Sequence, residues 1–172
     1  MEILTYVLEG SLEHKDSLGS GGVIVPGLVQ QMSAGKGIRH SEFNPSDEAS
    51  VHLLQIWLHP DRRGVKPRYG QKRFAPADLD GTLRLLASKA GSKGSIPIHQ
   101  DTNLYGGRLD PEKPLTWRNP RGRHVWLQVA RGKLSAGDRT LGAGDGAWTS
   151  DAGDIRLQAK EGRAEILLFD LA

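Results

Sequence analysis

The sequence predicts an all-β protein made of two small β-barrels in tandem. Three observations support this prediction: short strand-like runs separated by glycine or proline, no sustained helical periodicity, and a rhythm repeated in the two halves. The chain has 172 residues, including 22 glycines and 9 prolines. That length suits one ordinary domain or two small ones, and it is sufficient to bury a hydrophobic core.

Strand-like runs occur throughout the chain. In the first half they cover residues 2–8, 11–16, 23–25, 28–32 and 51–58. In the second half they cover residues 82–87, 95–100, 124–130, 132–135, 154–159 and 165–171. The run at 51–58 is the most apolar, so we expect it to be a buried central strand.

Between the halves, residues 59–77 have a different texture, with three prolines and many cationic side chains. This composition indicates a segment that crosses between domains. The predicted domains are therefore residues 1–75, which include most of this segment, and residues 76–172. Each half has a strand that ends in a glycine turn, at Gly10 and at Gly132, and each closes on an apolar strand. The two domains are thus predicted to be two copies of one small barrel.

Composition excludes several classes of protein. There is no cysteine, so disulfides and thiol catalysis are excluded, and any metal must be held by His, Asp or Glu. The net charge is +3, and the basic clusters match no nucleic-acid-binding motif, which favours a mixed, solvated surface. No apolar run approaches the ~20 residues of a membrane span, and no signal peptide is visible. We therefore expect a cytoplasmic protein without a membrane partner.

One pair of residues has the pattern of a chemical site. His40 and Glu42 form a His-x-Glu motif, whose side chains lie on one face of an extended strand because side chains alternate with period two. An imidazole and a carboxylate are suitable ligands for iron, manganese, nickel or zinc. The glycines before His40 allow the backbone to turn towards a barrel interior.

The context of this motif is more specific than its spacing. Gly37, His40 and Asn44 match the second motif of cupin barrels. The longer strings at residues 5–10, 14–17, 31–46 and 52–58 closely resemble the pirin family. The resemblance continues through residues 67–69, Phe74 and residues 99–101, 125–129 and 167–170, and so covers nearly the whole chain.

The resemblance implies a bicupin, with two tandem cupin barrels of which only the first carries a metal. In pirins the ligands are three histidines and one glutamate, and His40 and Glu42 match one histidine and the glutamate. The implied cofactor is one divalent transition metal, iron in the first place, with nickel, manganese or zinc as alternatives. The implied activity is quercetin 2,3-dioxygenase, with a flavonol as substrate and Glu42 as both ligand and candidate general base.

The other two histidines of the pirin site form a His-x-His motif, and this chain has none. In the family that motif lies just ahead of the segment that begins here at Met1, so we expect a first barrel that is incomplete at its N-terminus. This is typical of a start codon assigned late, or of a shortened or degenerate pirin. Residues 2–8 should then leave an edge or an apolar face uncovered. With two ligands, metal binding should be weak or absent, and the activity impaired.

Two functions from different classes remain open. The first is a pirin-type dioxygenase. The second is a non-enzymatic pirin-like protein, regulatory or redox-sensing, whose barrel binds a protein partner. Cupins host many unrelated functions, so the fold does not decide between them. His14 is an alternative, substitute ligand for the missing histidines. It matches a histidine that is not a ligand in the family, however, so we expect its replacement to leave metal binding nearly intact.

Overall fold

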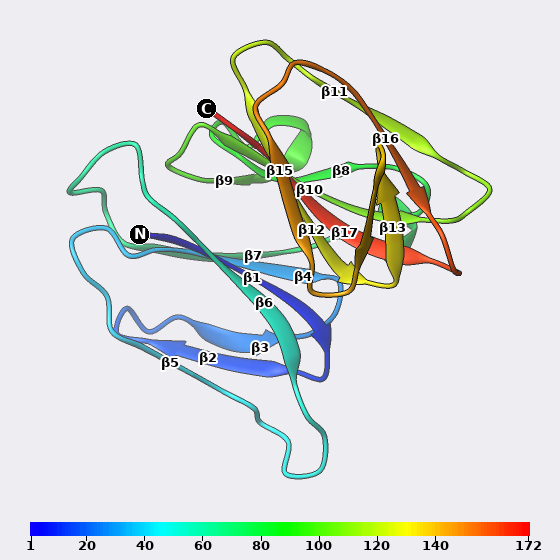
Figure 1. Ribbon diagram of the computed structural model, residues 1–172. Coiled ribbons are helices and arrows are strands. Elements are labelled where there is room, and N and C mark those ends of the chain that lie inside the picture. Colours follow the sequence, from blue (N-terminus) through cyan, green and yellow to red (C-terminus); the bar gives the residue numbers. More distant parts are fainter. The chain divides into compact units, whose positions relative to one another are not determined.

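The computed structural model describes all residues 1–172, and nearly all of its regular structure is β-strand (Figure 1). The chain divides into two compact units. The first consists of Met1–Ala75 and Ile96–Gln100, and the second of Pro76–Ser95 and Asp101–Ala172. The two helical segments, η1 (Pro76–Asp78) and η2 (Ser92–Gly94), are single 3-10 turns, and no helix has the length and apolar character needed to cross a bilayer. The predicted all-β fold is confirmed.

The first unit contains two antiparallel sheets. One has the strand order β6-β1-β4-β7 and the other the order β3-β2-β5. The strands are β1 (Glu2–Glu9), β2 (Leu12–Asp16), β3 (Gly21–Ile24), β4 (Leu28–Ser33), β5 (His40–Phe43), β6 (His52–Leu58) and β7 (Arg68–Arg73). Val7, Leu12 and Ile24 form a buried apolar cluster that joins strands of both sheets.

Two expectations about the first sheet are wrong. The run at residues 51–58 forms β6, which has only β1 as a neighbour and leaves Trp57 63% exposed. The run at residues 2–8 lies in β1, which is buried from Glu2 to Leu8 and lies between β6 and β4. An apolar run predicts burial, but the number of pairing partners decides whether a strand is central. Because β1 pairs on both sides, it takes the central position, and β6 takes the edge.

The predicted crossing segment at residues 59–77 contains β7, a strand that the sequence does not predict. β7 pairs with β4 from Leu28 opposite Arg73 to Ser33 opposite Arg68. Pro67 precedes the strand and Pro76 follows it, so neither proline removes a donor from the ladder. The polar composition concealed β7 because an edge strand tolerates solvated side chains.

The sequence predicts that residues 95–100 form a strand of the second domain. Only β9 (Ile96–Pro97) is extended, and Ile96–Gln100 belongs to the first unit. The carbonyl of His99 accepts a hydrogen bond from the N–H of Asp61 at 2.6 Å, and the side-chain amide of Gln100 donates to the carbonyl of His59 at 2.6 Å. One backbone and one side-chain hydrogen bond therefore tie His99 and Gln100 to residues of the first unit.

The second unit is built from two further antiparallel sheets. In one, neighbouring strands follow the order β15-β12-β17-β10-β8, and in the other the order β11-β16-β13-β14. The strands are β8 (Arg84–Ser88), β10 (Thr102–Leu109), β11 (Leu115–Asn119), β12 (His124–Arg131), β13 (Lys133–Ala136), β14 (Arg139–Gly142), β15 (Gly146–Thr149), β16 (Gly153–Ala159) and β17 (Ala164–Leu171). A buried cluster that includes Leu109, Val129, Leu134 and Ile166 forms its core.

Four strands of the second unit, β10, β11, β14 and β15, have no counterpart among the predicted runs. β10 was concealed by the pair Gly106 and Gly107 in its interior. A Cβ at Gly106 would lie 2.8 Å from Cδ1 of Leu86, and one at Gly107 would lie 2.7 Å from the carbonyl oxygen of Thr82. These glycines permit close packing on the strand and do not mark a turn.

The internal repeat predicted from the glycine turns is visible in the backbone. The pairing of β1 with β6 shifts register just before Gly10, and that of β12 with β17 shifts just before Gly132. Both glycines have positive φ, and a Cβ at either position would collide with a backbone carbonyl, that of Ser50 or of Arg163. The same bulge and turn therefore occur at equivalent places in the two units.

Candidate functional site

Strand pairing brings four ionisable side chains onto one face of the small sheet in the first unit. β2 and β5 are antiparallel, with His14 opposite Glu42 and Asp16 opposite His40. Directly opposed residues in an antiparallel pair share a face, as do residues two apart along a strand. His14, Asp16, His40 and Glu42 therefore form a cross-strand square.

The imidazole of His14 contacts the other three members of this square. Its Nδ1 is 3.4 Å from Oε1 of Glu42, and its Nε2 is 3.4 Å from Oδ2 of Asp16. Its ring stacks on that of His40, with 5.6 Å between centroids, and on that of Tyr69, with 4.6 Å between centroids. His14 is thus held between two carboxylates and between two rings.

Glu42 is bound by two amides from the larger sheet. Gln30 Nε2 donates to Oε1 at 2.7 Å, and Gln55 Nε2 donates to Oε2 at 2.6 Å. Thr5 is opposite Gln30 on β4 and opposite Gln55 on β6, so the three side chains form one row across that sheet. The carboxylate of Glu42 therefore joins the cross-strand square on the small sheet to the row of Thr5, Gln30 and Gln55 on the larger sheet. Each of its two oxygens accepts a hydrogen bond from one of the two amides.

Burial differs sharply within the site. The side chains of His14 and Asp16 are fully buried, that of Glu42 is 14% exposed, and His40 lies at the solvent surface. The site therefore opens to solvent on the side of His40.

Two pKa values are shifted here. Burial disfavours the ionised form of Asp16, but hydrogen bonds from the backbone N–H groups of Ser20 and Leu18, with His14, lower the pKa of this carboxyl below its usual value. Burial, reinforced by the negative charges of Asp16 and Glu42, raises the pKa of the Tyr69 hydroxyl. The hydroxyl therefore stays protonated at neutral pH, where it donates to Oε1 of Gln30 at 3.4 Å.

The residues present fit part of a metal site and not a complete one. His40 and Glu42 are of the right ligand types and lie on one face of β5. No group of three or more His, Asp or Glu side chains converges to hold a metal ion. Both oxygens of Glu42 accept amide hydrogens, and both nitrogens of His14 face carboxylates. The chain as it folds thus lacks the three protein ligands of a typical transition-metal centre.

Several residues around the pair were not singled out from the sequence. The sequence predicts His14 at most as a substitute ligand, yet it lies beside Glu42 and His40. His14 and Asp16 have the same two-residue spacing as His40 and Glu42, which indicates that the two side chains lie on one face of their strand. Gln30 and Gln55 could have been noticed as amides within otherwise apolar runs, since a buried amide needs a partner.

Comparison with known proteins places the whole chain in one family. The Pirin family model matches residues 1–58, and the model described as the quercetinase C-terminal cupin domain matches residues 85–171. The chain is 42% identical to the quercetin 2,3-dioxygenase of Escherichia coli, over 99% of this chain and 72% of that protein. The chain belongs to the pirin family.

Other pirins agree with this assignment. The pirin-like protein of Caulobacter vibrioides is 38% identical over 100% of this chain and 74% of its own length. The crystal structure of Escherichia coli YhhW superposes with a TM-score of 0.93 at 40% identity, covering 99% of this chain and 71% of that one. A second structure of bacterial pirin YhhW is a complex with nickel(II), with a TM-score of 0.92 at 42% identity, covering 99% and 72%. The resemblance read from the sequence is confirmed, and so is the bicupin fold class.

Proposed function

We propose that this pirin acts as a dioxygenase on a flavonol-type small molecule, with His40 and Glu42 as part of its metal coordination sphere. The observation that carries the proposal is the cross-strand square, in which an exposed imidazole and an oriented carboxylate share one face. The similarity to proteins named quercetin 2,3-dioxygenase supports the reaction class. The nickel(II) complex of the YhhW relative supports a divalent transition metal, with iron as the other candidate.

Glu42 is the proton acceptor in this proposal. The amides of Gln30 and Gln55 hold its two oxygens in place, so the carboxylate is oriented before a substrate arrives. A flavonol hydroxyl that reaches the site would transfer its proton to this carboxylate, which converts the substrate to a more oxidisable anion. A bound divalent transition metal supplies Lewis-acid chemistry at such a site.

We further propose that the chain by itself binds metal weakly. Two protein ligands leave most of the coordination sphere to water, and amide donors compete for both oxygens of Glu42. A second segment that carries His-x-His would complete the set of ligands. We expect such a segment, fused ahead of Met1, to raise both metal affinity and flavonol turnover.

The test compares the chain with that fusion. Nickel(II) and iron(II) content is measured by elemental analysis, and quercetin consumption is followed by absorbance together with carbon monoxide release. The fusion should hold one metal and turn over quercetin, and His40→Ala in the fusion should abolish both. His14→Ala in the fusion is the matched imidazole control, and we expect it to retain most of the metal. Tight stoichiometric binding by the short chain, unchanged by His40→Ala, would contradict the assignment.

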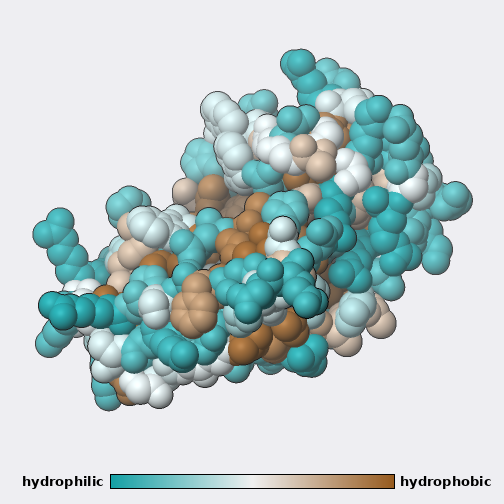
Figure 2. Space-filling view, turned by 90° about the horizontal axis from the view of Figure 1, so that it is seen from below, coloured by the Kyte–Doolittle hydropathy of each residue, from teal (hydrophilic) through white to brown (hydrophobic).

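A second candidate function is a pirin-like interaction protein, and the edge strand β6 favours it. β6 lies at the end of its sheet, with Trp57 63% exposed, and the Trp57 indole N–H donates to Oε1 of Gln55 at 3.0 Å. Figure 2 shows apolar surface among hydrophilic side chains on one face of the molecule. An exposed edge with a large aromatic side chain can recruit another protein. Concentration-dependent association in size-exclusion chromatography that Trp57→Ser removes would support this candidate, and an unchanged monomer for both proteins would count against it.

A further inference from the structure

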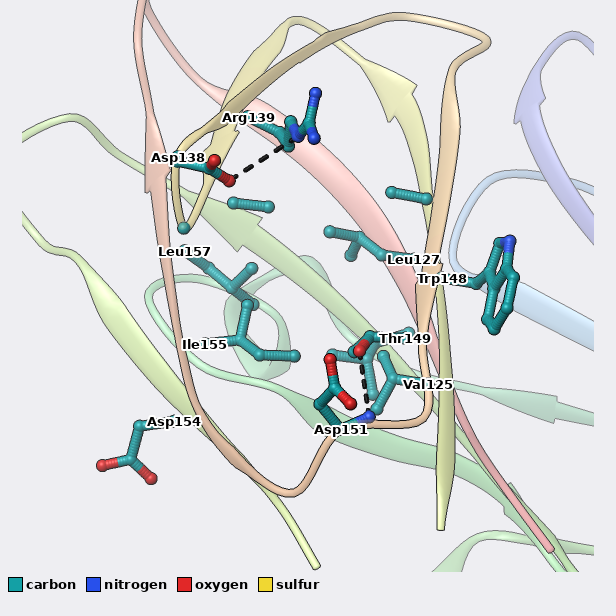
Figure 3. Close-up of a pocket in the computed structure, with 14 residues that line it drawn as sticks. Val125, Leu127, Asp138, Arg139, Trp148, Thr149, Asp151, Asp154, Ile155 and Leu157 are labelled. Atoms are coloured by element: carbon teal, nitrogen blue, oxygen red, sulfur yellow. Dashed lines mark hydrogen bonds and ion pairs between the residues drawn. The ribbon is translucent and has the colours of Figure 1, made fainter.

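The second unit contains a cavity that the pirin assignment leaves without a role. It has a volume of about 390 Å³ and is lined by strands of both sheets of this unit (Figure 3). Its apolar wall is formed mainly by Val125, Leu127, Ala136, Ile155, Leu157 and Leu168. The volume falls in the lower part of the range of small-molecule sites, which is about 300–1,000 Å³.

Strand register explains why these side chains point inward together. Leu127 is opposite Leu168 on β17 and opposite Ala147 on β15, and Ala136 is opposite Leu157 on β16. Opposed residues share a face, so the apolar lining is continuous across strands of both sheets of this unit. Leu127, Leu157 and Leu168 also belong to the buried core, so the cavity is an extension of the core that side chains leave open.

The cavity has few polar groups, and they differ in whether they have a partner within the chain. Asp151 follows β15, and its carboxylate points towards Thr149 and Ile155 at the edge of the cavity (Figure 3). Its backbone N–H donates to the hydroxyl of Thr149 at 3.0 Å, whereas its carboxylate belongs to an exposed residue and has no hydrogen-bond or ion-pair partner in the chain. Asp138 and Arg139 lie at the opposite end and pair with each other at 3.6 Å.

Asp154 also borders the cavity but faces away from it. In β16 the side chains of Ile155 and Leu157 point inward, so that of Asp154 must point outward, and Figure 3 shows it directed away from the apolar lining. Trp148 on β15 also points away from the cavity. The carboxylate of Asp151 is therefore the one acidic group that faces the cavity without a partner.

We propose that this cavity binds a small molecule with an apolar, ring-sized body and a protonated amino group. The body would occupy the apolar interior, and the ammonium group would lie at the mouth, bonded to the carboxylate of Asp151. A charge-assisted hydrogen bond of this kind is stronger than a neutral one. A carboxylate ligand would place two like charges together, and a neutral hydroxyl would gain only the weaker bond. The proposed site shares no residue with the cross-strand square of the first unit.

The test is isothermal titration calorimetry of the full chain with three probes that share one skeleton: 2-phenylethylamine, 2-phenylethanol and 3-phenylpropionate, at neutral pH. We expect the amine to bind about 2-fold to 5-fold more tightly than the alcohol, because Asp151 is exposed and exposed ion pairs contribute little, and we expect the acid to bind least. Asp151→Asn should weaken amine binding by about 2-fold to 5-fold and leave the alcohol nearly unchanged. Asp154→Asn removes the same charge three residues further along the chain, at the start of β16, and should change the affinity for neither probe.

A cavity-filling variant tests the contribution of the apolar interior separately from that of Asp151 at the mouth. Ala136→Leu places a larger side chain opposite Leu157 and should abolish binding of all three probes. Circular dichroism shows whether this variant is folded, and the two aspartate variants decide the proposal if it is not. Failure of the amine to bind, equal affinity for the three probes, or equal effects of Asp151→Asn and Asp154→Asn would each overturn the proposal.

Discussion

Replacing Glu42 with glutamine keeps the size of the side chain but removes its charge and one of its acceptors. Glu42 accepts from Gln30 at 2.7 Å and from Gln55 at 2.6 Å. A glutamine can present its oxygen to only one of these amides and its own NH₂ group to the other, so one donor loses its partner. Gln55 is exposed and water can replace its partner, whereas Gln30 is fully buried. The oxygen of the new side chain should therefore turn towards Gln30.

The expected cost follows from these contacts. One charge-assisted hydrogen bond is lost and the other becomes neutral, which corresponds to about 1.5–3 kcal/mol of the free energy of unfolding. Urea unfolding, followed by far-UV circular dichroism, measures this loss. Glu48→Gln, in an exposed loop, removes the same charge without a buried contact and should stay within about 0.5 kcal/mol of the parent. A Glu42→Gln protein as stable as the Glu48→Gln protein would refute the idea that the two amides clamp this carboxylate.

Three further perturbations test other parts of the structure. The lowered pKa of Asp16 means that its contribution is present at neutral pH and is lost as the pH falls through the folded-state value, below the usual 3.8. Asp16→Asn should therefore flatten the fall in urea midpoint in acid, and an unchanged acid profile would contradict this. Arg123→Ala leaves Asp170, bonded at 2.7 Å, without its main cation and should cost about 2–3 kcal/mol in thermal unfolding, whereas Arg139→Ala, in an exposed pair, should cost almost nothing. Leu134→Ala, at a fully buried core position, should cost about 3–5 kcal/mol, and a cost below about 1 kcal/mol would show that the core collapses around the gap.

Local patterns predicted much of the fold. Short runs between glycines and prolines indicated most of the strands, and the paired turns at Gly10 and Gly132 indicated the repeat that the register shifts display. The sequence did not predict strands whose composition reflects packing or solvent exposure instead of strand propensity. In β10 the two glycines serve close packing, and in β7 the polar side chains serve a solvated edge. Neither role can be predicted from the sequence without knowing which elements lie next to the strand.

One part of the candidate site could likewise be predicted from the sequence, and another part could not. The sequence by itself determined that His40 and Glu42 share a face, because alternation with period two is a property of a single extended strand. Only the tertiary structure decided that His14 and Asp16 stand opposite them and that Gln30 and Gln55 bind Glu42. These partners come from three other strands. Which strands become neighbours, and in which register, depends on pairing and packing across the whole unit, and no local pattern contains that information.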